Sequence, residues 1–210
     1  TAMKIWEKSV CLALIMTILF SFTGYTAECE DIPNRILRLH VLANSDSKQD
    51  QKLKLKVRDR ILAESKGMLN GVKTRGESEK VVSSHIPEIE KAARDEVRKQ
   101  GYSYPVNAEM TNMFFNTRQY GNVTIPAGMY DALRITIGSG KGHNWWCVLF
   151  PALCLPAAEA PSRLEDVLNQ DEMQVVKEPS GSGGYTVKFK SVELYEKFRS
   201  WLDGRKKLKG

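Results

Sequence analysis

The sequence predicts an α+β protein in which a mostly antiparallel sheet packs on one layer of helices. Apolar residues recur at helical spacing between residues 49 and 100. After residue 105 the pattern changes to short strand-like runs separated by Gly, Asn and Pro. Because one strand-like run precedes the helices and the other runs follow them, the order β-α-α-β-β-β favours segregated layers over a parallel βαβ fold.

The chain of 210 residues is predicted to have four parts. We expect a membrane-directing helix at 1–27, the α+β domain at 28–155, a linker at 156–184 and a partly flexible basic amphipathic tail at 185–210. The linker is rich in Pro, Gly and Ser, which is typical of connecting segments.

Positive charge is concentrated at the two ends. Of 31 Lys and Arg and 25 Asp and Glu, 21 of each fall within residues 28–184, so the body has no net charge. Nucleic-acid-binding domains usually carry positive charge on the folded body. We therefore expect no nucleic-acid partner, and we expect the basic tail to contact a membrane surface or an acidic partner, or to be a solvated end.

The N-terminal segment has the pattern of an export signal. Lys4 and Lys8 precede an uncharged, mostly apolar run from Ser9 to Ala27, and acidic residues follow at once. This charge order predicts that the remainder of the chain is exported. Ala27 suits the −1 position of a cleavage site but Tyr25 does not suit −3, so a cleaved signal peptide and a membrane anchor both stay open.

The first half of the body predicts one strand and two helices. A strand is expected at 35–42, followed by a polar turn at 43–47 and a helix from 49 to 65 with Ser47 as a candidate N-cap. A second helical stretch covers 77–100, where Pro87 should kink or restart the helix. Gly101 is placed to end this stretch in a left-handed conformation.

The second half predicts strands at 106–120, 123–125, 132–137 and 145–150. The glycine-rich segment 138–142 lies between two of them. It lacks the spacing of a phosphate-binding loop and is expected to form a flexible hairpin. Beyond Cys154 we expect a short helix at 162–168, an edge strand at 185–190 and an amphipathic helix at 192–202.

Two places are candidate partner-binding sites. Asn44, Ser45 and Asp46 follow a strand, where open α/β folds place ligands, although helix capping explains the same residues. Trp145 and Trp146 should place one ring on each face of a strand, and an exposed Trp is a frequent binding hot spot.

Cys147 has two interpretations. It could be the nucleophile of an envelope thiol hydrolase, but His143 on the same strand would lie about 13 Å away at roughly 3.3 Å per residue. Alternatively, Cys147 and Cys154 could form a disulfide in an exported chain. The remaining Cys and His residues show no metal-ligand spacing, so we predict no metal, no cofactor and no catalytic residue.

Several blocks of sequence resemble the stage II sporulation protein R family. They are Arg38-Leu-His-Val-Leu-Ala-Asn-Ser-Asp-Ser47, Tyr104-Pro-Val106, Pro126-Ala-Gly128, Tyr130-Asp-Ala-Leu-Arg134 and Asn144-Trp-Trp-Cys-Val-Leu-Phe-Pro151. The resemblance covers about residues 34–155, and residues 156–210 match no family block.

This resemblance implies a non-enzymatic signal that is exported from the forespore into the space between two membranes, either secreted or membrane-anchored. It implies that the partner is a membrane-embedded aspartic protease of the mother cell, which processes pro-sigma E. The rivals are the thiol hydrolase that uses Cys147 and a passive envelope-binding module.

Overall fold

A computed structural model of the chain describes residues 6, 9–14, 16–17, 31–120, 123–152, 164 and 167–177. Cys154 and the tail at 185–210 lie outside the described residues, as does most of the segment 1–27. Within the described ranges no helix is both long enough and apolar enough to cross a bilayer. The export segment and the tail therefore remain predictions.

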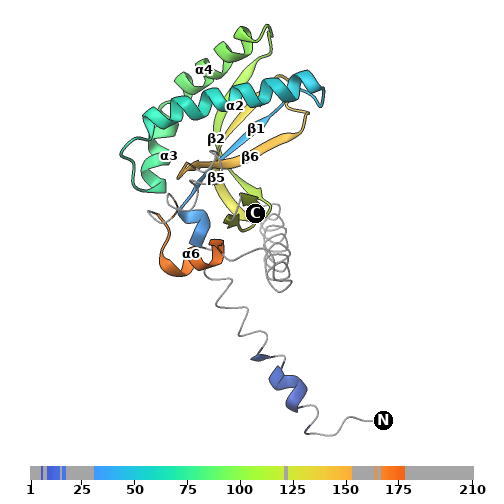
Figure 1. Cartoon of the computed structure of the whole chain (residues 1–210), viewed down its shortest axis with the longest axis vertical. Helices are drawn as coiled ribbons and strands as arrows, with labels where there is room; N and C mark the ends of the chain where they lie inside the picture. Colours follow the sequence, from blue (N-terminus) through green and yellow to red (C-terminus); the bar gives the residue numbers. More distant parts are fainter. Residues whose placement is uncertain are drawn as a thin grey trace, which may run out of the picture.

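A four-stranded sheet forms the centre of the protein (Figure 1). Its strands are β1 (Leu37–Leu42), β2 (Val106–Phe115), β5 (Gly128–Ile137) and β6 (Asn144–Phe150), in the order β2-β5-β1-β6. β1 runs parallel to β5, whereas β2 with β5 and β1 with β6 pair antiparallel. The predicted α+β class is confirmed, but the sheet is mixed because its central pair is parallel.

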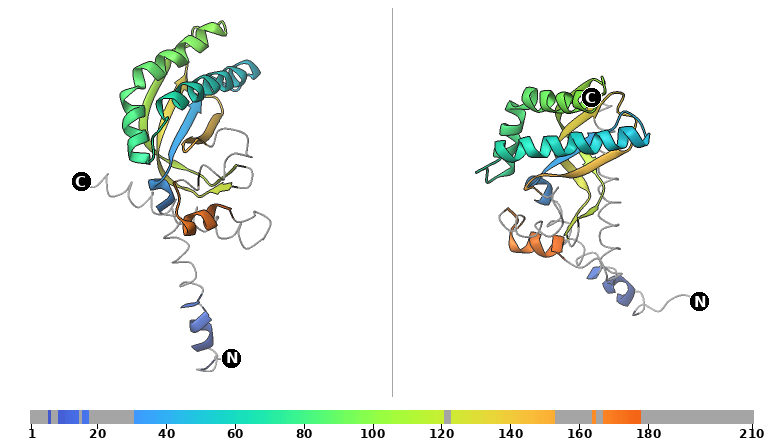
Figure 2. Two further views of the ribbon diagram at one scale, coloured as in Figure 1. Left: turned by 60° about the vertical axis from the view of Figure 1, so that its left-hand side comes forward. Right: turned by 45° about the horizontal axis from the view of Figure 1, so that its top comes forward.

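Three helices cover one face of this sheet (Figure 2). They are α2 (Lys48–Met68), α3 (Arg75–Ser84) and α4 (Ile86–Lys99). The core between helices and sheet is formed by aliphatic residues from both layers, among them Leu39, Val41, Val57, Ile61, Ile89, Val97, Leu133 and Ile135. The predicted helical layer is thus present, and its apolar spacing is the physical reason that it packs here.

Local signals act at three helix ends, although α2 runs to Met68 and not to the expected residue 65. The side chain of Ser47 accepts a hydrogen bond from the backbone N–H of Asp50 and caps α2. The second helical stretch divides just before Pro87, so α3 and α4 are separate helices. Gly101 follows α4 with a φ of +84°, a conformation that glycine adopts without strain.

A second core lies on the opposite face of the sheet. It is covered by the short helix η1 (Ile32–Asn34), by the two-stranded sheet of β3 (Arg118–Tyr120) and β4 (Val123–Ile125), and by α6 (Gln170–Lys177). Buried residues of this core include Ile32, Phe115, Ile125, Tyr130, Val148, Leu164, Met173 and Val176. α6 falls inside the expected linker 156–184, yet it packs on the body.

Two strand expectations need correction. The run 106–120 is not one strand, because β2 ends at Phe115 and β3, within the described part of the chain, pairs only with β4. The side chain of Thr117 accepts a hydrogen bond from the backbone N–H of Ala127, which holds the chain in its turn away from the main sheet. The segment 138–142 is not a hairpin either, because β1 lies between β5 and β6.

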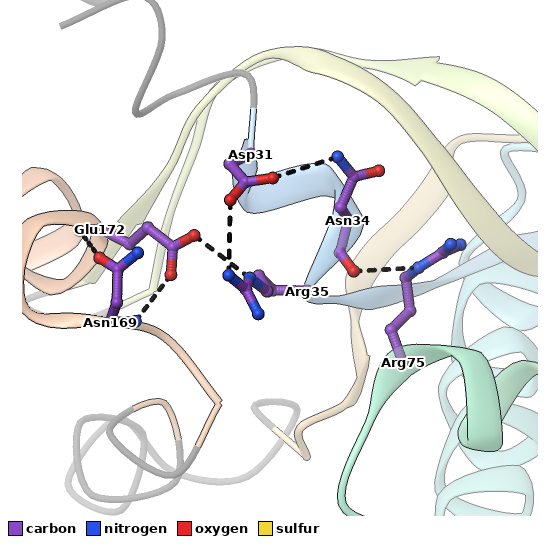
Figure 3. Close-up of polar contacts among 6 residues, drawn as sticks. All are labelled: Asp31, Asn34, Arg35, Arg75, Asn169 and Glu172. Carbon is purple, nitrogen blue, oxygen red and sulfur yellow. Dashed lines mark hydrogen bonds and ion pairs between the residues drawn. The ribbon is translucent and has the colours of Figure 1, made fainter. Parts of the chain in front are cut away.

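The start of the body is joined to its last described helix (Figure 3). Arg35 Nε donates to Glu172 Oε1 at 3.2 Å, and Glu172 Oε2 accepts from the backbone N–H of Asn169 at 2.7 Å. On the other side, Arg75 Nε of α3 donates to the carbonyl of Asn34 at 3.1 Å. Residues 31–35 therefore connect α3 with α6.

Candidate partner-binding site

The turn at 43–47 lies against the connection between β5 and β6, at the carboxyl end of β1. The backbone N–H of Ser139 donates to Asn44 Oδ1 at 3.0 Å, and Ser139 Oγ donates to the carbonyl of Asn44 at 2.7 Å. The backbone N–H of Gly142 donates to the carbonyl of Ala43 at 2.9 Å. Two segments almost one hundred residues apart in sequence thus form one surface.

Two glycines of this connection are required by the close approach. Gly138 has a φ of +59°, and a Cβ there would collide with the side chain of Asn44. At Gly142 a Cβ would collide with the backbone of Ser45. The glycine-rich segment therefore allows the turn at 43–47 to pack closely against it.

Asp50, in the first turn of α2, is the centre of the polar network beneath the turn. Its Oδ2 accepts from Asn44 Nδ2 at 2.9 Å and from Ser45 Oγ at 2.5 Å. Burial alone would raise the pKa of Asp50, but hydrogen bonds from the side chains of Ser45, Asn44, Tyr104 and Ser47 outweigh it and lower the pKa. Asn44 and Ser45 are therefore engaged inside the protein, as the capping interpretation expects.

Asp46 is the exposed member of the predicted trio. Its Oδ1 accepts from the backbone N–H of His143 and contacts the ring Nδ1 of His143, both at 2.5 Å. The hydrogen bonds from the His143 ring and backbone lower the pKa of Asp46. The carbonyl of His143 in turn accepts from Lys54 Nζ at 2.8 Å, so α2 also anchors the connection between β5 and β6.

Trp145 and Trp146 point to opposite faces, as predicted. Trp145 lies on the helical face, where the guanidinium of Arg58 sits 4.2 Å from the ring centroid. Trp146 lies on the other face and stacks on His40, with ring centroids 3.9 Å apart and an angle of 8° between planes. Both rings are half-buried. The structure does not bring the two Trp side chains into one patch.

The face that carries Trp146 also contains a group that the sequence did not single out. Arg38 is fully buried on this face, and its Nη2 donates to the hydroxyl of Tyr120 at 3.1 Å. The Tyr120 hydroxyl donates to the carbonyl of Trp146 at 3.1 Å. One signal was available, because Arg38 and His40 alternate with Leu37, Leu39 and Val41 and so mark a polar second face of the strand.

His40 is 3% exposed on this face. Burial, followed by the positive charge of Arg134, lowers the pKa of His40 to about 4, against an opposing contribution from the Asn144 side chain. The imidazole is therefore neutral at physiological pH, which suits its stacking against Trp146.

Cys147 is buried at 1% exposure among the residues beneath the helices. His40 is the cross-strand partner of Trp146, and its ring lies on the other face of the sheet. The disulfide partner predicted for Cys147 is Cys154, which lies outside the described residues, so the bridge stays a prediction.

A cavity of about 950 Å³ lies at the opposite end of β6, between that strand and the end of α2. It is lined by apolar residues such as Leu62, Leu69, Leu149 and Val167, with Lys66 and Lys73. None of the predicted site residues that the structure describes lines this cavity.

The family model described as stage II sporulation protein R matches residues 33–160, more than half of the chain. The chain belongs to the stage II sporulation protein R family. The stage II sporulation protein R of Bacillus subtilis (strain 168) is 42% identical over 123 residues, which cover 59% of this chain and 55% of that protein. The alignment thus spans about half of the relative's length. No solved structure gives a significant match.

The part of the chain that matches the stage II sporulation protein R family includes the whole four-stranded sheet and the three helices on it. The turn at 43–47, the connection at 138–143 and both Trp residues fall inside the match. The family assignment supports a role in sporulation. The surface that contacts a partner has to be inferred from the geometry of the body.

Proposed function

We propose that this protein is an exported signal of sporulation that acts by binding. It leaves the forespore, enters the space between the two membranes, and activates a membrane-embedded aspartic protease of the mother cell that processes pro-sigma E. The observation that carries the proposal is the family match over residues 33–160. The charge order of the segment 1–27 supports export of the body that follows it.

The geometry of the body suits recognition better than catalysis. The turn at 43–47 is fixed from three sides, by α2, by the connection at 138–143 and by its own capping bonds. Asp46, Ser139 and His143 are exposed on this fixed surface. A preorganised surface loses little conformational entropy when a partner binds.

Activation by binding requires a difference in affinity. The domain must bind the active arrangement of the protease more tightly than the inactive one, because equal affinity for both would shift no population. To move the protease from about 1% to about 99% active, the ratio of affinities would have to be on the order of 10⁴.

The burial of Cys147 argues against the thiol hydrolase. A nucleophilic thiolate needs access to substrate and an adjacent base, whereas Cys147 is buried and the ring of His40 lies on the other face of the sheet. If Cys147 were the nucleophile, Cys147→Ala would abolish activity with stability unchanged and Cys154→Ala would not. A structural bridge predicts similar destabilisation from either change, by about 2.5 kcal/mol for so short a loop.

The proposed function can be tested in a bacterial host that lacks the sporulation genes and carries the protease and pro-sigma E. Co-expression of the full chain should cause pro-sigma E to be processed. The matched control lacks residues 1–27, so that the same body stays in the cytosol, and should give no processing. Equal processing with both forms would contradict recognition from outside the membrane, and none with either would contradict activation.

A further inference from the structure

Arg38 of β1 is a fully buried cation held mainly by aromatic rings. Its guanidinium carbon lies 4.5 Å from the ring centroid of Phe115, 5.2 Å from that of Tyr130 and 5.8 Å from that of Tyr120. Burial lowers the pKa of Arg38, but an arginine side chain stays protonated in proteins. A full positive charge therefore sits inside the second core.

The donors of this guanidinium are not satisfied. Only Nη2 has a hydrogen-bond partner, the hydroxyl of Tyr120, while Nε and Nη1 have none within the described part of the chain. No carboxylate among the described residues forms an ion pair with Arg38, although eight ion pairs between other arginine–carboxylate partners occur there. Buried donors without partners are rare in native proteins and call for an explanation, such as an ion that the free chain lacks.

The surroundings add positive rather than negative charge. Arg118 is close enough that its charge further lowers the pKa of Arg38. The positive charge of Arg134 likewise lowers the pKa of His40. The carboxylate partner of Arg134 is Glu109, which is 3.6 Å away and half-exposed. His40 is neutral, so it does not compensate the arginines. The electrostatics of this face therefore favour an incoming anion.

We propose that Arg38 is the receptor for a carboxylate that enters between the β3–β4 sheet and Trp146. In an arginine, Nε and Nη2 lie on the same side of the guanidinium and together match the two oxygens of a carboxylate. The Tyr120 hydroxyl holds the Nη2 position, so a carboxylate that displaces this hydroxyl would also satisfy Nε.

The cover over Arg38 is a small element. Tyr120 is half-buried and belongs to the three-residue strand β3, which among the described strands pairs only with the three-residue β4. Because β4 is buried in the second core, the side chain of Tyr120, and not the whole sheet, is what an entering carboxylate has to displace. The carboxylate has two sources: an acidic side chain of a partner protein, or a small free carboxylate. The first source rests on the proposed function, with the protease as the partner, and the second does not.

The first experiment measures thermal unfolding of the purified full chain in sodium acetate and in sodium chloride at equal ionic strength and neutral pH. Acetate should raise the unfolding midpoint of the wild type above its value in chloride, and Arg38→Met should abolish this difference. Arg58→Met is the matched control, because Arg58 also lies over an aromatic ring but on the helical face. It should keep the difference.

The second experiment measures pro-sigma E processing by the same variants in the host described above. Arg38→Met should lower processing at least tenfold, and Arg58→Met should not. If Arg38→Met loses the acetate effect but processes pro-sigma E normally, the site binds small carboxylates. If Arg38→Met loses processing and the wild type shows no acetate effect, the site binds an acidic side chain of a partner. If the wild type itself fails to stimulate processing, the proposed function fails and the acetate comparison alone decides the site.

The proposal is overturned if Arg38→Met matches the wild type in both experiments, since Arg38 would then be a structural cation only. If Arg38→Met does not fold, Arg38→Lys and Tyr120→Phe take its place. Tyr120→Phe should retain or increase the acetate shift, and Arg38→Lys should reduce it because an ammonium cannot pair with both oxygens in the same way. Equal midpoints in both salts for the wild type and Tyr120→Phe, with normal processing by Arg38→Lys, would also overturn it.

Discussion

Arg35 and Glu172 form an ion pair, with 3.2 Å between Nε and Oε1, across 137 positions of sequence. Glu172 is 1% exposed and also closes a capping interaction with Asn169, whose side chain accepts from the backbone N–H of Glu172 at 2.8 Å. The start of α6 is thus fixed to the first residues of the body. This contact places α6 against the second core, beside residues 31–35.

Glu172→Gln should loosen α6 from the body. The change removes the ion pair and weakens the cap, so we expect a loss of about 1–2 kcal/mol in unfolding free energy. Limited proteolysis should also cut the chain faster within residues 164–177. Asp171→Asn, at the exposed neighbouring position, is the control and should change neither. Unchanged stability and cleavage in Glu172→Gln would mean that the pair does not hold α6.

Gly138→Ala should destabilise the joined turns. The substitution places a Cβ against Asn44 at a positive φ, so we expect a cost of about 1–3 kcal/mol, measured by denaturant unfolding. Gly67→Ala is the matched control, because Gly67 is exposed in α2 with no atom near the new Cβ. It should be neutral or stabilise by about 0.5–1 kcal/mol. Equal effects from both changes would contradict the close approach.

Asp50→Ala should remove the centre of the network under the turn. It leaves the donors of Asn44 and Ser45 without their acceptor, at a cost of about 1–3 kcal/mol. Because the pKa of Asp50 is lowered in the folded state, its contribution is complete above the ordinary pKa of about 3.9 and is lost as the pH falls through the lower folded value. Unfolding at pH 7 should therefore separate the variant from the wild type, and strong acid should reduce the gap. Asp59→Ala, which removes an exposed partner of Arg58, should have little effect.

His40 should make the stability of the protein fall in mild acid. Its folded pKa of about 4 lies below the unfolded value, so neutral His40 favours folding above pH 6.5 and this advantage is lost as the pH falls toward 4. The loss is on the order of 2 kcal/mol at pH 5. His40→Phe keeps a ring against Trp146 and should flatten the decline between pH 6.5 and 5 in urea unfolding. Arg134→Met should reduce the decline only in part, and an identical profile in the wild type and His40→Phe would contradict the assignment.

Features set by neighbouring residues could be predicted from the sequence. The cap at Ser47, the restart before Pro87 and the positive φ of Gly101 each depend on the chemistry of a few adjacent positions, and each is confirmed. The strand order depends instead on which distant segments pair. The residues of the run 35–42 do not indicate that this strand lies between β5 and β6. Because it does, the segment 138–142 crosses over β1 and is not the expected hairpin.

The candidate site divides in the same way. The position of Asn44, Ser45 and Asp46 at the end of a strand could be predicted, but their partners Ser139 and His143 are more than ninety residues away and could not. Arg38 was missed because a charged residue inside a strand-forming run reads as an exposed position. Arg38 is buried because the β3–β4 sheet folds over the second face. The prediction of a single strand at 106–120 did not include this separate sheet.

The central claim is that the body activates the protease from outside the cell membrane by binding it. The most direct measurement is the fraction of pro-sigma E processed when wild-type full chain is exported, compared with the form that lacks residues 1–27. We predict processing with the exported chain and none with the retained one. Processing that proceeds equally when the body never leaves the cytosol would contradict the account.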